Sequence, residues 1–97
     1  MVYSTHINIE KEIENGSEYW QVEGIEYPNL ITDGKDVEEA IEMARDAWTL
    51  LCVVYEDKNV DIEPLDNKFE EIFTENKVTT IIDSFDTDVY RDEMPDN

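Results

Sequence analysis

Residues 19–55 read YWQVEGIEYPNLITDGKDVEEAIEMARDAWTLLCVVY, and this stretch decides the fold. Its first part alternates in polarity, with Trp20 and Val22 on one face, which is the period of a strand with one buried side. Pro28 lacks a backbone donor and interrupts the ladder. We therefore expect a strand over about 18–26, a bend, a short strand over 30–32 and a Thr-Asp-Gly turn into a helix.

The predicted helix has a complete start signal. Asp36 is placed to cap it, and Glu39, three residues later, closes a capping box. Apolar residues then recur every three or four positions, which is typical of a helix packed on a sheet. This stripe comprises Val37, Ala40, Ile41, Ala44, Ala47, Trp48, Leu51, Val54 and Tyr55. The helix is predicted to end near Glu56 or Asp57.

The N-terminal residues predict a hairpin. Residues 2–9 alternate as a strand, which the charged run 10–14 can extend. Asn15-Gly16 then supplies the positive backbone dihedrals of a tight reversal into the strand that contains Trp20.

Three segments follow the helix. Pro64 favours an extended connector over 62–65, and the spacing of Phe69, Ile72 and Phe73 predicts a short helix or helical turn within 66–76. A β-branched run over 78–82 predicts a buried final strand. Residues 86–97 are predicted as a polar tail, with Val89 and Tyr90 holding its start and 94–97 frayed.

Together these elements predict an α+β fold. A small antiparallel sheet of about three to four strands, in the order β-β-β-α-β, is covered on one face by one long helix. The 97 residues suffice for one core, so residues 1–91 are expected to form a single domain and 92–97 an acidic C-terminal tail.

The chain is strongly acidic throughout. It has 26 acidic and 7 basic residues, a net charge of −19, with −9 in residues 1–55 and −10 in residues 56–97. Such a field repels nucleic-acid backbones and anionic lipids and attracts basic surfaces, so we expect no direct nucleic-acid binding and a basic protein partner. The alternative is that the charge serves solubility or a salt-adapted host. No apolar run approaches the length of a membrane span, and the N-terminus lacks a signal-peptide pattern, so a cytoplasmic protein is expected.

No catalytic or metal motif is evident. Cys52 is the single cysteine and falls on the buried side of the predicted helix, which excludes an intramolecular disulfide. Asp83, Asp86 and Asp88 are closely spaced, but the glycine and glutamate of a calcium loop are missing, so a solvated turn is expected. His6 is expected to be exposed or half-exposed on its strand. We predict no enzyme activity, no metal and no cofactor.

The run GIEYPNLITDGKDVEEAIEMARDAW resembles the signature of the HicB antitoxin family of bacterial toxin–antitoxin systems. That signature has an aromatic-Pro-Asp-Leu element before Thr-x-Gly-Asp-Thr and a Glu-Glu-Ala helix start. The matching positions are Tyr27, Pro28, Leu30, Thr32, Gly34, Glu38, Glu39, Ala40 and Ala44. Pro64 and the segments 81–83 and 88–91 also resemble later family elements. The departures are Asn29 for aspartate, Lys35-Asp36 for Asp-Thr and a missing Pro-Gly-Cys after Leu30.

The resemblance implies a partial ribonuclease-H-like core and an inhibitory function. The usual partner of the family is the HicA toxin, a small, basic ribonuclease similar to double-stranded-RNA-binding domains, whose active site and RNA-binding surface the antitoxin covers. We expect such a partner to contact an acidic rim formed by Glu12, Glu14, Glu38, Glu42 and Asp46. Longer members continue into a DNA-binding segment, whereas this sequence ends in acidic residues, so operator binding is not expected.

Other possibilities stay open from the sequence. One is a phage-type nucleic-acid mimic that inhibits a defence nuclease and uses the same core. Another is an enzyme, which would need a cluster of titrating groups in a cleft. A homodimer is possible through a strand edge near Leu30 or Val78, although repulsion between two chains at −19 opposes it.

Overall fold

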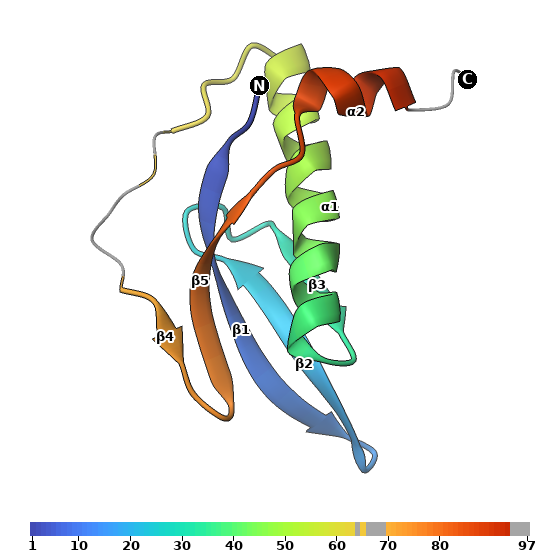
Figure 1. Ribbon diagram of the computed structural model, residues 1–97, viewed down its shortest axis with the longest axis vertical. Coiled ribbons are helices and arrows are strands. Elements are labelled where there is room, and N and C mark those ends of the chain that lie inside the picture. The colour runs from blue at the N-terminus through green and yellow to red at the C-terminus, as the bar shows by residue number, and fades with distance from the viewer. Residues whose placement is uncertain (64, 66–69, 94–97) are drawn as a thin grey trace.

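The computed structural model describes residues 1–63, 65 and 70–93, which form one five-stranded antiparallel sheet and two helices (Figure 1). The α+β prediction is confirmed, with one more strand and one more helix than expected. The sheet order is β3-β2-β1-β5-β4. The elements are β1 (Ser4–Glu14), β2 (Ser17–Gly24), β3 (Ile31–Gly34), α1 (Val37–Asp57), β4 (Ile72–Phe73), β5 (Lys77–Asp83) and α2 (Thr87–Glu93).

Strand β1 is the centre of the sheet. Ile9 lies opposite Val22 of β2 on one side and opposite Val78 of β5 on the other. The strand continues to Glu14, as the charged run predicted. Asn15 and Gly16 then reverse the chain with φ of 53° and 81°, which is the left-handed conformation expected of this turn.

The core lies between one face of the sheet and α1. Ile7, Ile9 and Val22 are fully buried on the sheet side, and the indole of Trp48 is fully buried on the helix side. The Trp48 Nε1–H donates to the carbonyl of Tyr3 at 3.0 Å, so this large ring is buried with its polar atom satisfied. The predicted apolar stripe therefore packs on the sheet from Val37 to Leu51, whereas its last two members, Val54 and Tyr55, are half-buried outside the core cluster.

The start of α1 confirms the predicted cap at Asp36, but the Glu39 side chain reaches the N–H one residue before the one that a capping box predicts. The Glu39 N–H donates to the Asp36 carboxylate at 2.7 Å, and the Glu39 side chain accepts from the Lys35 N–H at 3.2 Å. Just before this cap, Gly34 lies so close to α1 that an added Cβ would be 2.7 Å from the Ala40 Cα. The turn glycine is thus required for the close approach of β3 and α1.

The predicted helical turn within 66–76 is wrong where the structure describes it. Ile72 and Phe73 form β4, paired with β5, and a turn closed by the Thr74 N–H on the Lys77 carbonyl at 2.8 Å joins the two strands. A β-branched and an aromatic residue favour a strand, and the open edge of β5 supplies its partner. Residues 64 and 66–69, including the predicted proline connector, lie outside the described residues.

The C-terminal region is more ordered than the predicted polar tail. Asp86 accepts the Asp88 N–H at 2.9 Å, and α2 begins beside it and continues to Glu93. Val89 is exposed and does not hold this segment, whereas Thr87 is fully buried. The predicted tail 92–97 therefore starts inside α2, and residues 94–97 lie outside the described part of the chain.

The two outer strands of the sheet are β3 and β4. The predicted open edge at Val78 is wrong, because β5 is paired with β1 on one side and β4 on the other. The other predicted edge, next to Leu30, is the outer strand β3.

Candidate functional site

Two of the predicted contact residues, Glu12 and Glu14, lie on the sheet. Ile7 and Ile9 of β1 point into the core, so the even-numbered residues of this strand point away from α1. Glu14 is exposed and Glu12 is half-buried. We call these two residues the sheet pair.

The other three predicted contact residues lie on α1. Glu38, Glu42 and Asp46 follow one another at intervals of one helical turn, and all three are exposed. We call them the helix row. The five predicted contact residues therefore form two separate groups and not one rim, because the sheet pair and the helix row lie on different sides of the molecule.

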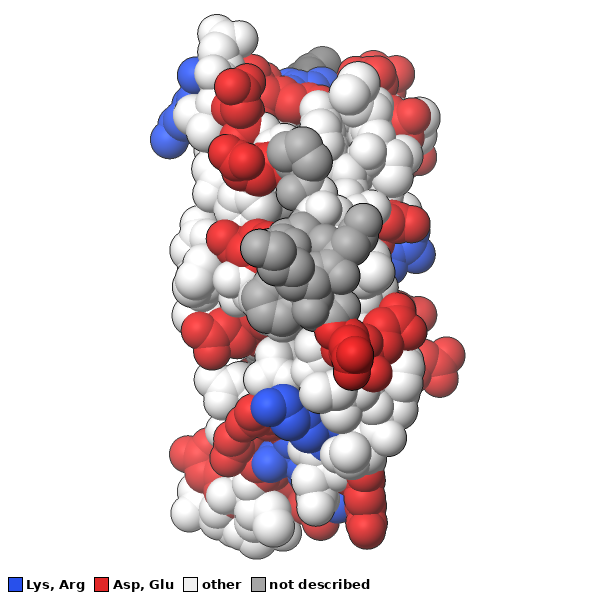
Figure 2. Space-filling model, turned by 90° about the vertical axis from the view of Figure 1, so that its left-hand side faces the viewer, with Lys and Arg blue, Asp and Glu red and all other residues white. Residues whose placement is uncertain are grey.

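The five carboxylates of these two groups have no ion pair or hydrogen-bond partner among the residues that the structure describes. The cations, by contrast, are mostly engaged internally: Lys11 with Glu18 at 3.3 Å, Lys35 with Glu39 at 3.7 Å, Lys77 with Glu10 at 3.7 Å and Arg91 with Glu56 at 2.9 Å. Figure 2 shows the result on the side of the molecule that carries β4, where carboxylates are spread from end to end with few basic groups. Among the described residues, Lys58 and Arg45 are the cations that form no ion pair, so unpaired carboxylates outnumber unpaired cations.

Further carboxylates lie on the same outward face of the sheet as the sheet pair. Glu10, Glu23 and Asp33 occupy outward positions on β1, β2 and β3, and all three are exposed. Outward side chains follow one another about 7 Å apart along a strand. A shallow hollow of about 90 Å³ lies among them, lined by Asn8, Glu10, Gln21 and Glu23. This face is thus an acidic sheet surface that extends beyond the two predicted residues.

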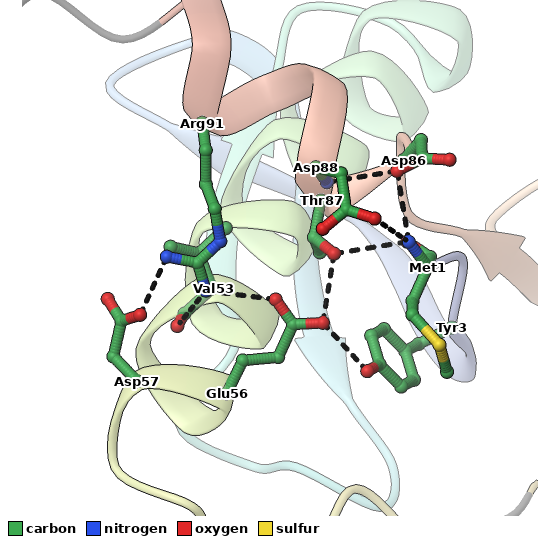
Figure 3. A network of polar contacts seen from close by, with 9 residues as sticks. All are labelled: Met1, Tyr3, Val53, Glu56, Asp57, Asp86, Thr87, Asp88 and Arg91. Carbon is green, nitrogen blue, oxygen red and sulfur yellow. Dashed lines mark hydrogen bonds and ion pairs between the residues drawn. The ribbon is translucent and has the colours of Figure 1, made fainter.

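A second polar feature joins α1, α2 and the N-terminus, and it centres on Glu56 (Figure 3). The Glu56 carboxylate accepts hydrogen bonds from Tyr3 Oη at 2.8 Å, Thr87 Oγ1 at 2.9 Å and Arg91 Nη2 at 2.9 Å. Arg91 also donates to Asp57 at 2.6 Å and to the Val53 carbonyl at 3.2 Å. These contacts fix α2 against the last turns of α1.

The network changes the acidity of its members. Burial alone would raise the pKa of Glu56, but the hydrogen bonds from Arg91, Tyr3 and Thr87 outweigh it and hold that pKa below its ordinary value. The same contact acts in reverse on the phenol, since the bond to the Glu56 carboxylate, with burial, raises the pKa of Tyr3 to about 12. Glu56 is therefore an ionised structural anchor with its acceptor capacity in use.

The three aspartates considered as a metal site have other partners. The Met1 ammonium contacts Asp86 at 2.9 Å and Asp88 at 3.3 Å, which lowers the pKa of Asp86, and Ser4 donates to Asp83 at 2.5 Å. Within the described part of the chain, no group of three or more histidine, cysteine or acidic side chains is arranged to hold a metal ion.

The strand alternation predicted an exposed or half-exposed His6, and this prediction is wrong. The side chain is only 1% exposed. The chain leaves the sheet after Gly24, and Glu26 folds back beside β1. One of its carboxylate oxygens accepts the His6 N–H at 2.6 Å and the Thr5 hydroxyl at 3.0 Å, and the other lies 3.0 Å from His6 Nδ1. A ring buried in this way cannot contact a substrate in solvent, although its carboxylate partner is typical of a general base.

Cys52 is buried, as predicted, and burial raises the pKa of its thiol to about 12. Burial and the raised pKa both disfavour the thiolate that a nucleophilic cysteine needs. An open hollow of about 780 Å³ lies beside Tyr3 and Glu56, bordered by residues 59–63. Three carboxylates line this hollow: Glu56 is already bonded within the network, and Asp61 and Glu63 are exposed in the segment after α1.

No protein-family model, curated protein or solved structure matches this chain. Neither helix in the described residues is both long and apolar enough to cross a membrane.

Proposed function

We propose that this chain is a HicB-like antitoxin that binds and inhibits a small, basic HicA-type ribonuclease through its acidic surface. One observation carries the proposal: four of the six lysine and arginine residues that the structure describes form internal ion pairs, whereas the sheet pair and the helix row have no partner among the described residues. Unpaired carboxylates at fixed positions attract a basic protein and compete for the groups that bind RNA phosphates.

The residues that carry the family resemblance support the fold rather than the contact. Gly34 permits the approach of β3 to α1, and Glu39 closes the cap. Of this set, Glu38 is exposed and belongs to the helix row. The resemblance therefore suggests the class of the partner, and the carboxylates without internal partners suggest where that partner binds.

The test is inhibition of RNA cleavage by a HicA-type toxin, taken from the adjacent gene where that gene encodes a small basic protein. The unmodified chain is expected to form a stable complex and to stop cleavage at an equimolar ratio. Absence of a complex, with cleavage unaffected, would refute the proposal. A salt series adds a second readout, because an association steered by charge slows as ionic strength rises.

Charge-matched variants locate the contact. Glu12→Gln with Glu14→Gln neutralises the sheet pair, and Glu38→Gln with Glu42→Gln neutralises two members of the helix row. A control pair, Glu70→Gln with Glu75→Gln, makes the same charge change on exposed residues near β4. A double substitution that slows association by more than the control pair identifies residues at the interface. Equal effects of all three double substitutions would show that only the net charge matters.

A second candidate is an acidic nucleic-acid mimic, of phage type, that inhibits a defence nuclease. The nearly equal charge of the two halves of the chain, −9 and −10, favours it, because a mimic needs negative charge over its whole surface. Gene neighbourhood distinguishes the candidates: an adjacent small basic toxin gene supports the antitoxin, and a phage early region without one supports the mimic.

A further inference from the structure

A groove of about 430 Å³ lies between α1 and α2, apart from the Glu56 network. It is lined by Asp46, Phe85, Asp86, Val89, Tyr90 and Glu93. Asp46 is the last member of the helix row, and the other five residues belong to α2 or to the segment just before it. The groove therefore continues one of the two predicted contact surfaces.

The floor and wall of this groove are apolar and held in place. Phe85 is 40% exposed and Val89 is 55% exposed, although both are large apolar residues. The Phe85 N–H donates to the buried Thr49 hydroxyl at 2.9 Å, and the Arg45 guanidinium lies 4.1 Å from the centre of the Phe85 ring. A preformed, exposed apolar surface of this kind is typical of an interaction site.

The rim of the groove is acidic. Asp46 and Glu93 have no ion pair among the described residues, while Asp86 shares its charge with the Met1 ammonium at 2.9 Å. The nearby cation, Arg45, is occupied by the Phe85 ring and by the Asp83 carbonyl at 3.1 Å. The acidic rim therefore favours the binding of an apolar side chain that has basic side chains on either side of it.

The surface of α1 extends the groove lengthwise. Met43 and Leu50 are exposed, and they lie three residues before and four residues after Asp46, on the same side of the helix. An apolar strip with a carboxylate at its middle has the spacing that accepts the apolar face of another helix.

We propose that this groove binds a cationic amphipathic helix of the basic partner, with one large apolar side chain inserted against Phe85 and Val89. The inference rests on the proposed function for the identity of the partner. A second copy of this chain is the less suitable occupant, because each copy has a net charge of −19.

The test uses a synthetic helical peptide of lysine, arginine and alanine with one central leucine, and a control peptide in which that leucine is alanine. Binding is followed by amide chemical shifts of the isotope-labelled protein. The leucine peptide is expected to bind about five- to tenfold more tightly than the control, as burial of roughly half of one such side chain implies. The largest shifts are expected at Asp46, Phe85, Val89 and Tyr90.

Two variants complete the design. Val89→Ser is expected to remove most of the preference for leucine, whereas Val60→Ser, which changes a valine of similar exposure in the segment after α1, leaves it unchanged. Equal affinity of the two peptides, shifts confined to the sheet pair, or no binding at millimolar peptide would each overturn the groove proposal.

The same variants separate this inference from the proposed function. If the basic ribonuclease is bound and inhibited equally well by the unmodified chain and by Val89→Ser, the groove proposal fails and the antitoxin proposal stands. If the ribonuclease is not bound but the leucine peptide occupies the groove, the antitoxin proposal fails and the groove remains a site for cationic helices.

Discussion

Replacing Glu56 by glutamine tests whether one ionised side chain holds α2 and the N-terminus against α1. The substitution keeps the size of the side chain and removes its charge. Three donors, the Tyr3 hydroxyl, the Thr87 hydroxyl and the Arg91 guanidinium, then face an amide in place of a carboxylate. Nothing in the α1 stripe or the sheet changes.

The expected magnitude follows from these contacts. A hydrogen bond to a charged group contributes about 1.5–3 kcal/mol and one between neutral groups about 1 kcal/mol. Glutamine retains one acceptor oxygen, and Arg91 keeps its contacts to Asp57 and Val53. Since the Glu56 side chain is only 20% exposed, solvent screens it weakly, and we expect a loss of about 2–3 kcal/mol in the free energy of unfolding.

The assay is thermal unfolding followed by circular dichroism at neutral pH and fixed salt. For a domain of this size, about 1 kcal/mol corresponds to roughly 4–8 °C, so Tm is expected to fall by about 10–20 °C. Asp57→Asn is the matched control: it removes the other carboxylate bound by Arg91, but that side chain is 60% exposed, and the pair contributes less than about 1 kcal/mol. Equal shifts in the two variants would refute the assignment of Glu56 as the anchor.

Four further results are expected. The pKa of Glu56 is lower in the folded state than in the unfolded state, so the stability difference between the unmodified chain and Glu56→Gln is fully present above the ordinary glutamate pKa of about 4.3. This difference is expected to shrink as pH falls through the folded-state pKa. Urea titrations at several pH values measure it, and a pH-independent difference would contradict the expectation. Cys52 is expected to react with a thiol reagent only after urea unfolding, since burial raises its pKa to about 12, and rapid labelling of the native protein would show that the helix opens locally. Gly34→Ala forces a Cβ against the backbone of Ala40 and is expected to cost about 2–4 kcal/mol in denaturant unfolding, with an unchanged midpoint arguing against close β3–α1 packing. Added sodium chloride is expected to raise Tm of the unmodified chain by screening repulsion among its 26 acidic residues, and a lower Tm in salt would mean that ion pairs dominate.

The parts of the fold that depend on neighbouring residues were predictable from the sequence. The capped start of α1, its apolar stripe and the Asn15-Gly16 hairpin each have their causes within a few positions of the chain. Strand β4 was not predictable, because a two-residue strand exists only where β5 offers it a partner. Helix α2 was missed because the residues that fix it, Glu56 and Met1, are distant in sequence.

The candidate site was predictable only in part. Exposure of the helix row follows from helical periodicity, and the outward direction of the sheet pair follows from strand alternation. The two groups lie on different sides of the molecule because of the face of the sheet on which α1 packs. No local sequence pattern determines that face. The burial of His6 has the same origin, since it depends on Glu26, which follows the hairpin and returns to β1.

The position of β1 at the centre of the sheet also determines when the sheet can finish forming during synthesis. Its first partner, β2, follows within a few residues, but Ser4 pairs with Asp83, almost at the other end of the chain. During synthesis at about 5–20 residues per second, the 26 residues from Lys58 to Asp83 take about 1–5 s, during which one edge of β1 has no strand beside it. An unpaired edge next to an apolar face invites association with other nascent chains. The high negative charge opposes such association, so the acidity proposed here to attract a partner also protects the protein before it has finished folding.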